Sequence, residues 1–131
     1  MHTDVSQIKA GKKDFSLQSV TQQLIGAAFE VHNVLGYGFL EKVYQRAMQV
    51  ELRVRGVKVE LEPFLQVQFK GVVVGGYAAD LLVEGEIIVE LKTDAIYQFF
   101  HEAQLLNDLR GPGIQLGYLI NFGCEKVEYG I

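Results

Sequence analysis

Three residues in a short stretch of the chain could do chemistry together: Asp80, Glu90 and Lys92. Side chains alternate along a strand, so a strand through Glu90 and Lys92 points both to one face of a sheet. A preceding strand that carries Asp80 can add a second carboxylate to that face. Two carboxylates form a hard oxygen site suited to Mg²⁺ or Mn²⁺. A neighbouring lysine can hold a phosphate or help to deprotonate a water molecule.

The same stretch also has a plain structural interpretation. The sequence Val89-Glu90-Leu91-Lys92 is ordinary for a strand that has one solvated, charged face and one buried face. Ile88 shares the face of Glu90 and Lys92, while the other face carries Ile87, Val89 and Leu91. Short motifs of this kind match by accident, so the interpretation depends on the rest of the chain.

A shared metal site requires a particular strand register. The pattern predicts strands over Tyr77–Val83 and Glu86–Lys92, with a hairpin turn at Glu84-Gly85. A two-residue turn would place Asp80 opposite Val89, and therefore on the wrong face. A three-residue loop or a bulge would instead place Asp80 opposite Glu90. We therefore expect the longer connection.

Composition sets the broad class of the protein. The 131 residues are 49% hydrophobic and 21% charged, which predicts a single folded domain. The formal net charge is −4, which argues against a strong non-specific grip on nucleic acid. It does not exclude a nuclease, because active-site carboxylates add negative charge that a bound metal would offset.

The cellular setting follows from what the sequence lacks. No apolar run is long enough to span a bilayer and no signal segment opens the chain, so we expect no membrane association and a cytoplasmic location. Cys124 is the single cysteine and cannot form an internal disulfide, which fits a reducing compartment. We expect it to be a semi-buried spectator. Residues 1–15 are polar and predict a mobile tail, and residues 16–131 form the domain.

Two helices are predicted ahead of the strands. The first begins after a cap at Ser16 or Ser19 and runs to about Leu35. Gly36-Tyr37-Gly38 breaks it, and a second helix runs from about Leu40 to Arg55. The predicted apolar stripe of the second helix is Leu40, Val43, Tyr44, Ala47, Val50 and Val54. Glu41 lies in its first turn, where a carboxylate favours the helix dipole. A lone histidine on a helix is most often structural, and this is the default for His32.

The remaining pattern predicts an α/β fold with a mixed sheet flanked by helices. The further expected strands are Val57–Leu61, Phe64–Phe69, Val72–Val74, Leu116–Phe122 and Val127–Ile131. Gly75-Gly76 is expected to form a bend or bulge before Asp80. A third helix over Tyr97–Arg110 would connect two strands as a crossover, which implies a parallel strand pair.

Several separated motifs resemble one known family. Gly38-Phe39-Leu40-Glu41-Lys42-Val43-Tyr44 fits the signature that names the GxxExxY protein family. The other matching segments are, in order, Glu30-Val31-His32, Asp80, Val89-Glu90-Leu91-Lys92, His101-Glu102-Ala103-Gln104-Leu105-Leu106 and Gly117 to Gly123. The resemblance covers about Leu17 to Gly123. That family is placed in the PD-(D/E)xK nuclease superfamily, which implies a restriction-endonuclease-like core.

The resemblance also implies roles for individual residues. Asp80 and Glu90 would be metal ligands, assisted by the carbonyl group of Leu91. Lys92 would be the catalytic lysine. Glu41 would be the helical acidic residue that completes the metal site.

A further element carries a departure from the family pattern. Gln104 resembles the glutamine of the Gln-x-x-x-Tyr element in RecB-type relatives, which implies a catalytic role for it. Asp108 stands at the tyrosine position, so an aromatic ring is lost and a negative charge is gained. Ala79 stands where a proline is usual before the motif aspartate.

Two functions follow as hypotheses. The first is a nuclease that uses Mg²⁺ or Mn²⁺ to hydrolyse phosphodiester bonds of DNA or RNA. The second is a nuclease-fold binding module with little or no turnover, which acts through a protein partner or a homodimer interface. The acidic pI of about 5.3, the sparse basic surface and Asp108 favour the second hypothesis.

Overall fold

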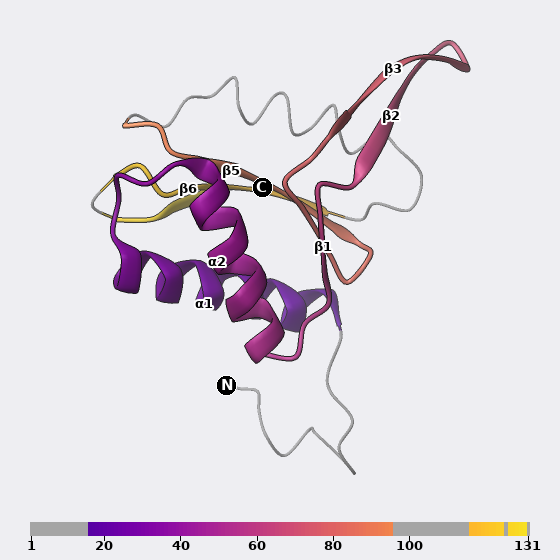
Figure 1. Ribbon diagram of the computed structural model, residues 1–131. Helices are drawn as coiled ribbons and strands as arrows, with labels where there is room; N and C mark the ends of the chain where they lie inside the picture. The colour runs from indigo at the N-terminus through magenta and orange to yellow at the C-terminus, as the bar shows by residue number, and fades with distance from the viewer. Residues whose placement is uncertain (1–15, 96–115, 125, 131) are drawn as a thin grey trace.

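The computed structural model describes residues 16–95, 116–124 and 126–130 (Figure 1). Within this part of the chain, helices α1 (Leu17–Leu35) and α2 (Glu41–Val54) precede all of the strands. The strands are β1 (Val59–Leu61), β2 (Phe64–Phe69), β3 (Val72–Ala78), β4 (Leu81–Val83), β5 (Ile87–Lys92), β6 (Leu116–Asn121) and β7 (Glu128–Gly130). None of the helices described is long and apolar enough to cross a membrane.

Helix α1 begins and ends where the sequence predicts. The Ser16 hydroxyl caps it by accepting a hydrogen bond from the backbone N–H of Ser19, at 3.2 Å. Gly36 follows its last residue with a φ of 70°, a left-handed conformation that suits glycine. The buried residues of its inner face recur at helical spacing: Val20, Leu24, Ala27, Ala28 and Val31. The predicted first helix is therefore confirmed.

Helix α2 has the predicted extent, but its predicted apolar stripe was only partly right, since Tyr44 is buried and Ala47 packs against the core while the other members are exposed. The buried residues are Tyr44, Gln45, Met48 and Leu52. Of the predicted stripe, the exposed members are Leu40, Val43, Val50 and Val54. Apolar residues occur on two sides of this helix, and the fold buries the side of Met48 and Leu52. That side also carries Gln45, whose amide donates hydrogen bonds to Glu62 and to the Asp80 carbonyl.

The main sheet is mixed, with the strand order β1-β4-β5-β6-β7. Strands β4 and β5 are antiparallel, β5 and β6 are parallel, and β7 forms one edge. The predicted mixed sheet and the predicted parallel pair are confirmed. The helix predicted over Tyr97–Arg110 lies outside the described residues.

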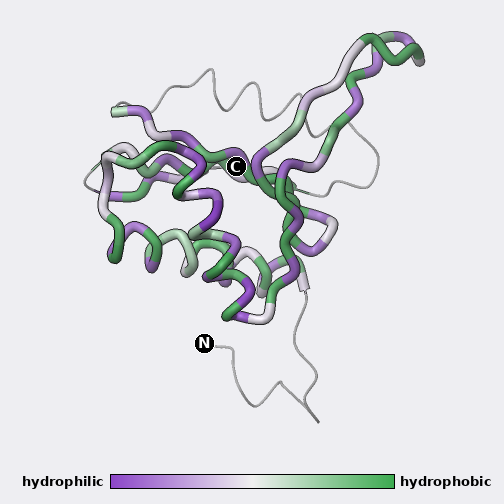
Figure 2. Tube along the Cα trace, viewed as in Figure 1, coloured by the Kyte–Doolittle hydropathy of each residue, from purple (hydrophilic) through white to green (hydrophobic). Residues whose placement is uncertain are grey.

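Strands β2 and β3 form a separate hairpin that projects from the body of the protein (Figure 1). Hydrophobic residues lie along it (Figure 2). Phe69 and Val72 of this hairpin are exposed. Its pairing shifts between Val67 and Gln68, which leaves Val74 as an extra residue just before Gly75. The bulge expected near Gly75-Gly76 is therefore present.

The single strand predicted over Tyr77–Val83 was wrong. Tyr77 belongs to β3 of the hairpin, whereas Leu81–Val83 form β4 of the main sheet. The chain crosses between the two sheets at Ala79-Asp80. The Ala79 N–H donates to the Pro63 carbonyl at 3.0 Å, so the return strand stays tied to the outgoing one.

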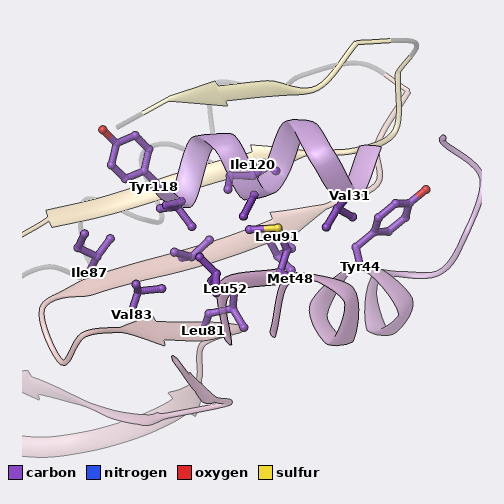
Figure 3. Packing of buried hydrophobic residues seen from close by; sticks show 14 of the residues in the cluster. Val31, Tyr44, Met48, Leu52, Leu81, Val83, Ile87, Leu91, Tyr118 and Ile120 are labelled. Atoms are coloured by element: carbon purple, nitrogen blue, oxygen red, sulfur yellow. The ribbon is translucent and has the colours of Figure 1, made fainter. Parts of the chain in front are cut away.

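The main core lies between the sheet and the two helices (Figure 3). Residues Leu81, Val83, Ile87, Val89 and Leu91 contribute to it from β4 and β5. The opposite face of the sheet holds a smaller cluster built on Ala79, Ile88 and Leu119. Alternation along β5 therefore sends odd-numbered residues toward the helices and even-numbered residues away from them.

Candidate functional site

The β4–β5 hairpin has the register that a shared site requires. Leu81 pairs with Val89 and Val83 with Ile87, which leaves Glu84, Gly85 and Glu86 as the connection. Both Glu84 and Gly85 have positive φ values, 52° and 69°. Continued along the strands, this register places Asp80 opposite Glu90. The expected three-residue connection is confirmed.

Asp80 and Glu90 contact each other's strands through reciprocal hydrogen bonds. The Leu91 N–H donates to Asp80 Oδ2 at 2.6 Å, and the Asp80 N–H donates to Glu90 Oε1 at 3.1 Å. The ladder of paired residues ends at Leu81 and Val89. Beyond it the two carboxylates take the place of backbone carbonyls as acceptors, which fixes both side chains at the end of the hairpin.

Lys92 lies on the same sheet face as Glu90. Both follow Ile88 at even-numbered positions of β5, and Ile88 belongs to the cluster opposite the helices. Glu90 and Lys92 are half-buried, as is Asp80. The predicted arrangement of Glu90, Lys92 and Ile88 on one face is therefore confirmed.

Glu41 reaches the site from the first turn of α2. It lines a pocket of about 180 Å³ together with Asp80. Burial raises the pKa of the Glu41 carboxyl, and the Asp80 carboxylate raises it further, whereas the Lys92 ammonium lowers it. Asp94 adds a weaker upward effect. The pKa of the Glu41 carboxyl therefore depends on both Asp80 and Lys92.

The same pocket holds a polar network that was not predicted from the sequence. The buried Gln45 amide donates to the Asp80 carbonyl at 3.0 Å and to Glu62 Oε2 at 3.3 Å. Lys42 forms an ion pair with that same Glu62 oxygen at 2.6 Å. A signal was present in the sequence, because Glu41 and Gln45 are separated by four residues and lie on one side of a helix.

Gln45 ties the helix that carries Glu41 to the residue that carries the Asp80 carboxylate. Its side chain is 3% exposed, and its Oε1 is buried without a hydrogen-bond partner. The Asp80 carbonyl also accepts from the Glu62 N–H at 3.0 Å. The backbone of Asp80 is therefore held from two directions.

His32 and Cys124 are structural. His32 Nε2 lies 2.7 Å from the Cys124 carbonyl oxygen, and the imidazole stacks on Phe122. The Cys124 thiol is half-buried and donates to the Ala95 carbonyl at 3.1 Å. Burial raises the pKa of this thiol, and a hydrogen bond with Glu128 raises it further. A raised pKa disfavours the reactive thiolate, which fits a spectator cysteine.

The donor atoms suit a hard divalent cation. The opposed positions of Asp80 and Glu90 supply carboxylate oxygens, and Glu41 lines the same pocket as Asp80. Within the described residues, however, no group of three or more acidic, histidine or cysteine side chains is already gathered as a metal site. One oxygen of Asp80 and one of Glu90 face backbone N–H groups. Gln104 and Asp108 lie outside the described residues.

Comparison with known families agrees with this geometry. The sequence model of the PD-(D/E)XK nuclease superfamily matches residues 18–131. Comparisons with curated proteins and with solved structures found no match. Two helices followed by a mixed sheet form a restriction-endonuclease-like architecture. The match spans most of the chain, and the protein therefore belongs to the PD-(D/E)XK nuclease superfamily.

Proposed function

We propose that this protein is a nuclease that hydrolyses phosphodiester bonds of DNA or RNA with the help of Mg²⁺ or Mn²⁺. The observation that carries the proposal is the hairpin register, which puts Asp80 opposite Glu90 at one end of the sheet. Lys92 shares the face of Glu90, and Glu41 shares a pocket with Asp80. Membership of a nuclease superfamily supports this interpretation.

The proposed metal ligands are Asp80, Glu90 and the Leu91 carbonyl, with Glu41 as a further ligand or as the acceptor of a metal-bound water. When bound, a divalent cation polarises a phosphate and lowers the pKa of a coordinated water. The Leu91 N–H donates to the Asp80 carboxylate, and the Asp80 N–H donates to the Glu90 carboxylate. These hydrogen bonds would hold both carboxylates in place while their other oxygens bind the metal.

Lys92 is proposed to stabilise negative charge on the phosphate and to orient the attacking water. Its ammonium lowers the pKa of Glu41, and its side chain shares a sheet face with Glu90. Gln104 is proposed to hydrogen-bond the phosphate or to fix Lys92.

A second function is a nuclease-fold binding module without turnover. It is favoured by the net charge of −4 and by the ion pair that occupies Lys42, which reduce the positive surface available to phosphate. The absence of a gathered metal cluster among the described residues also favours it. Such a module would act through a protein partner or as a homodimer.

Cleavage assays separate the two functions. Single-stranded and double-stranded DNA and RNA would be incubated with Mg²⁺, with Mn²⁺ and with EDTA. We expect metal-dependent cleavage that falls by about 10²- to 10³-fold in Lys92→Ala, because one charge-stabilising group is lost. Lys58→Ala is the matched control, since Lys58 is an exposed lysine beside the turn at the other end of the hairpin.

One result would favour the binding module instead: the absence of cleavage of every substrate, together with a melting temperature that does not respond to either metal. Cleavage that survives unchanged in Lys92→Ala would instead contradict the proposed role of Lys92, since it would place the activity elsewhere.

A further inference from the structure

The loop between the two helices presents aromatic rings to solvent beside the candidate site. This aromatic loop comprises residues 36–40, Gly-Tyr-Gly-Phe-Leu. Tyr37 is 59% exposed, Phe39 is 46% exposed and Leu40 is 79% exposed. Clustered exposed apolar groups next to a functional site indicate a binding surface, and aromatic rings bind other flat groups by stacking.

A buried column of rings supports the exposed ring of Phe39. Phe39 packs edge-to-face on Tyr44, with centroids 6.2 Å apart. Tyr44 stacks on Phe122 at 4.6 Å with only 9° between the ring planes, and Phe122 stacks on His32 at 6.2 Å. Tyr44 and Phe122 are fully buried. Phe39 is therefore the outer end of a rigid aromatic stack.

The backbone of the aromatic loop is held by the same column. The Tyr44 hydroxyl donates to the Gly36 carbonyl at 2.6 Å and lies 3.4 Å from the Phe39 N–H, which donates to it. Gly36 and Gly38 have φ values of 70° and 111°, and a Cβ at either would have no neighbour within 4 Å. These glycines shape the turn and do not make room for packing. The loop is therefore preorganised, and a ligand would bind it with little loss of entropy.

The aromatic loop leads directly into the catalytic candidate Glu41, which follows Leu40 as the first residue of α2. Glu41 lines a pocket together with Asp80. The ring column also reaches the candidate site at its inner end, because the Phe122 N–H donates to the Lys92 carbonyl at 2.9 Å. Electrostatic attraction to phosphate is weakened here, because Lys42 is paired with Glu62 and the chain carries a net charge of −4. Beyond the proposed contact of Lys92 with phosphate, stacking on the rings would supply affinity for a nucleic acid at this site.

We propose that the aromatic loop stacks an unpaired base of single-stranded nucleic acid, whose backbone then lies at the Asp80–Glu90 site. This inference rests on the proposed nuclease function and narrows its substrate class. Bases inside a duplex already stack on one another, whereas an unpaired base offers a free face to Phe39 or Tyr37. Stacking of this kind is tolerant of sequence, so the loop would select for strandedness and not for a motif.

A binding experiment in EDTA tests the inference without any chemistry. The probe is a single-stranded oligonucleotide, DNA or RNA, with one 2-aminopurine whose fluorescence falls when the base stacks, compared with the same strand in a duplex. We expect the full-length protein to quench the single strand and to bind the duplex more weakly. Phe39→Leu and Tyr37→Leu should each raise the Kd for the single strand by about 5- to 150-fold.

Phe69→Leu is the matched control, because Phe69 is 62% exposed on the projecting hairpin. We expect it to leave binding unchanged. Equal affinity for single strand and duplex, unchanged affinity in both Phe39→Leu and Tyr37→Leu, or no nucleic-acid binding at all would overturn the inference. The last result would indicate that the loop contacts a protein. If Phe39→Leu does not fold, Tyr37→Leu carries the test, since that ring is the more exposed of the two.

The outcome is separable from that of the proposed function. Ring-dependent binding without metal-dependent cleavage would contradict the nuclease and leave the base-stacking loop in place. Metal-dependent cleavage that is insensitive to both ring substitutions would leave the nuclease and remove the base-stacking loop.

Discussion

The two faces of the β4–β5 hairpin serve opposite purposes. On the face toward the helices, Leu81, Val83, Ile87, Val89 and Leu91 are at most 1% exposed. On the other face, Glu90 and Lys92 are half-buried and stand beside Asp80. Strand alternation alone produces this division. The hairpin can therefore hold charged groups in fixed positions while its other face provides the stability.

The two faces also differ in the interactions that stabilise their side chains. The apolar face needs only close packing, which the core supplies. The charged face must compensate its partly buried carboxylates, and it does so with the N–H groups of Leu91 and Asp80. Substitutions of the buried residues on the first face should therefore cost stability, whereas substitutions of Asp80, Glu90 or Lys92 on the second should cost function.

The largest expected effect on stability is at the apolar face. Leu91→Ala should lower the free energy of unfolding by about 2–5 kcal/mol, because it removes buried methyl groups and leaves a cavity. Glu90→Gln, one residue away, should lower it by less than about 1 kcal/mol, since an amide oxygen can still accept from the Asp80 N–H. Urea unfolding of the two variants would measure the difference. Similar losses in both would show that the faces are not divided in this way.

An intermediate effect is expected at Gln45, which connects α2 to the charged face. Gln45→Glu should lower the free energy of unfolding by about 1–3 kcal/mol near neutral pH, because it would set a carboxylate against Glu62 Oε2 and the Asp80 carbonyl. Gln45→Leu should cost less, because it also removes the buried Oε1 that has no partner. Unfolding curves for both variants give the ranking. A greater loss in Gln45→Leu would mean that the donated hydrogen bonds matter more than charge repulsion.

The smallest expected effect is a pH dependence at Glu41. The folded-state pKa of the Glu41 carboxyl is raised, so the protonated group contributes to stability. This contribution is complete below the unfolded-state pKa and is lost as the pH rises through the folded-state pKa. In EDTA, Glu41→Gln should therefore be more stable than the wild type above that range. The gain should be less than about 1 kcal/mol, because burial of the Glu41 side chain is only partial and solvent screens its charge. The difference should vanish below the ordinary pKa of a glutamate carboxyl, 4.5. Melting temperatures of both proteins across this pH range test the prediction. A higher melting temperature for the wild type than for Glu41→Gln at neutral pH would contradict it.

Most of the charged face could be predicted from the sequence, because strand geometry is simple. The need to bring Asp80 opposite Glu90 was enough to predict the three-residue connection between β4 and β5. The transfer of the chain from one sheet to the other at Ala79-Asp80 could not be predicted, since Tyr77–Val83 is suitable throughout for a strand. That break depends on pairing of β1 with β4, which is distant in sequence.

Helix α2 shows why the rest of the site was harder to predict. Val50 and Val54 look like core residues by hydrophobicity, yet they are exposed, while the polar Gln45 is buried. Burial of Gln45 depends on acceptors supplied by Asp80 and Glu62, which only the folded protein brings together. Tertiary packing of Tyr44, Met48 and Leu52, together with these hydrogen bonds, therefore determines the buried side of the helix.

The central claim is that the charged face binds a divalent cation through Asp80. The direct measurement is the melting temperature of the wild type and of Asp80→Asn, each with EDTA and with Mg²⁺ or Mn²⁺. Glu60→Gln, an exposed change on β1, is the control. Metal at about 100 times its Kd should stabilise the wild type and the control by roughly 2.7 kcal/mol.

Asp80→Asn should behave differently from both. Without metal it should be as stable as the wild type or more so, because an amide oxygen can still accept from the Leu91 N–H while one negative charge beside Glu41 is removed. With metal it should gain nothing. An equal metal-dependent rise in melting temperature in the wild type and in Asp80→Asn would show that Asp80 is not a ligand, and would contradict the account.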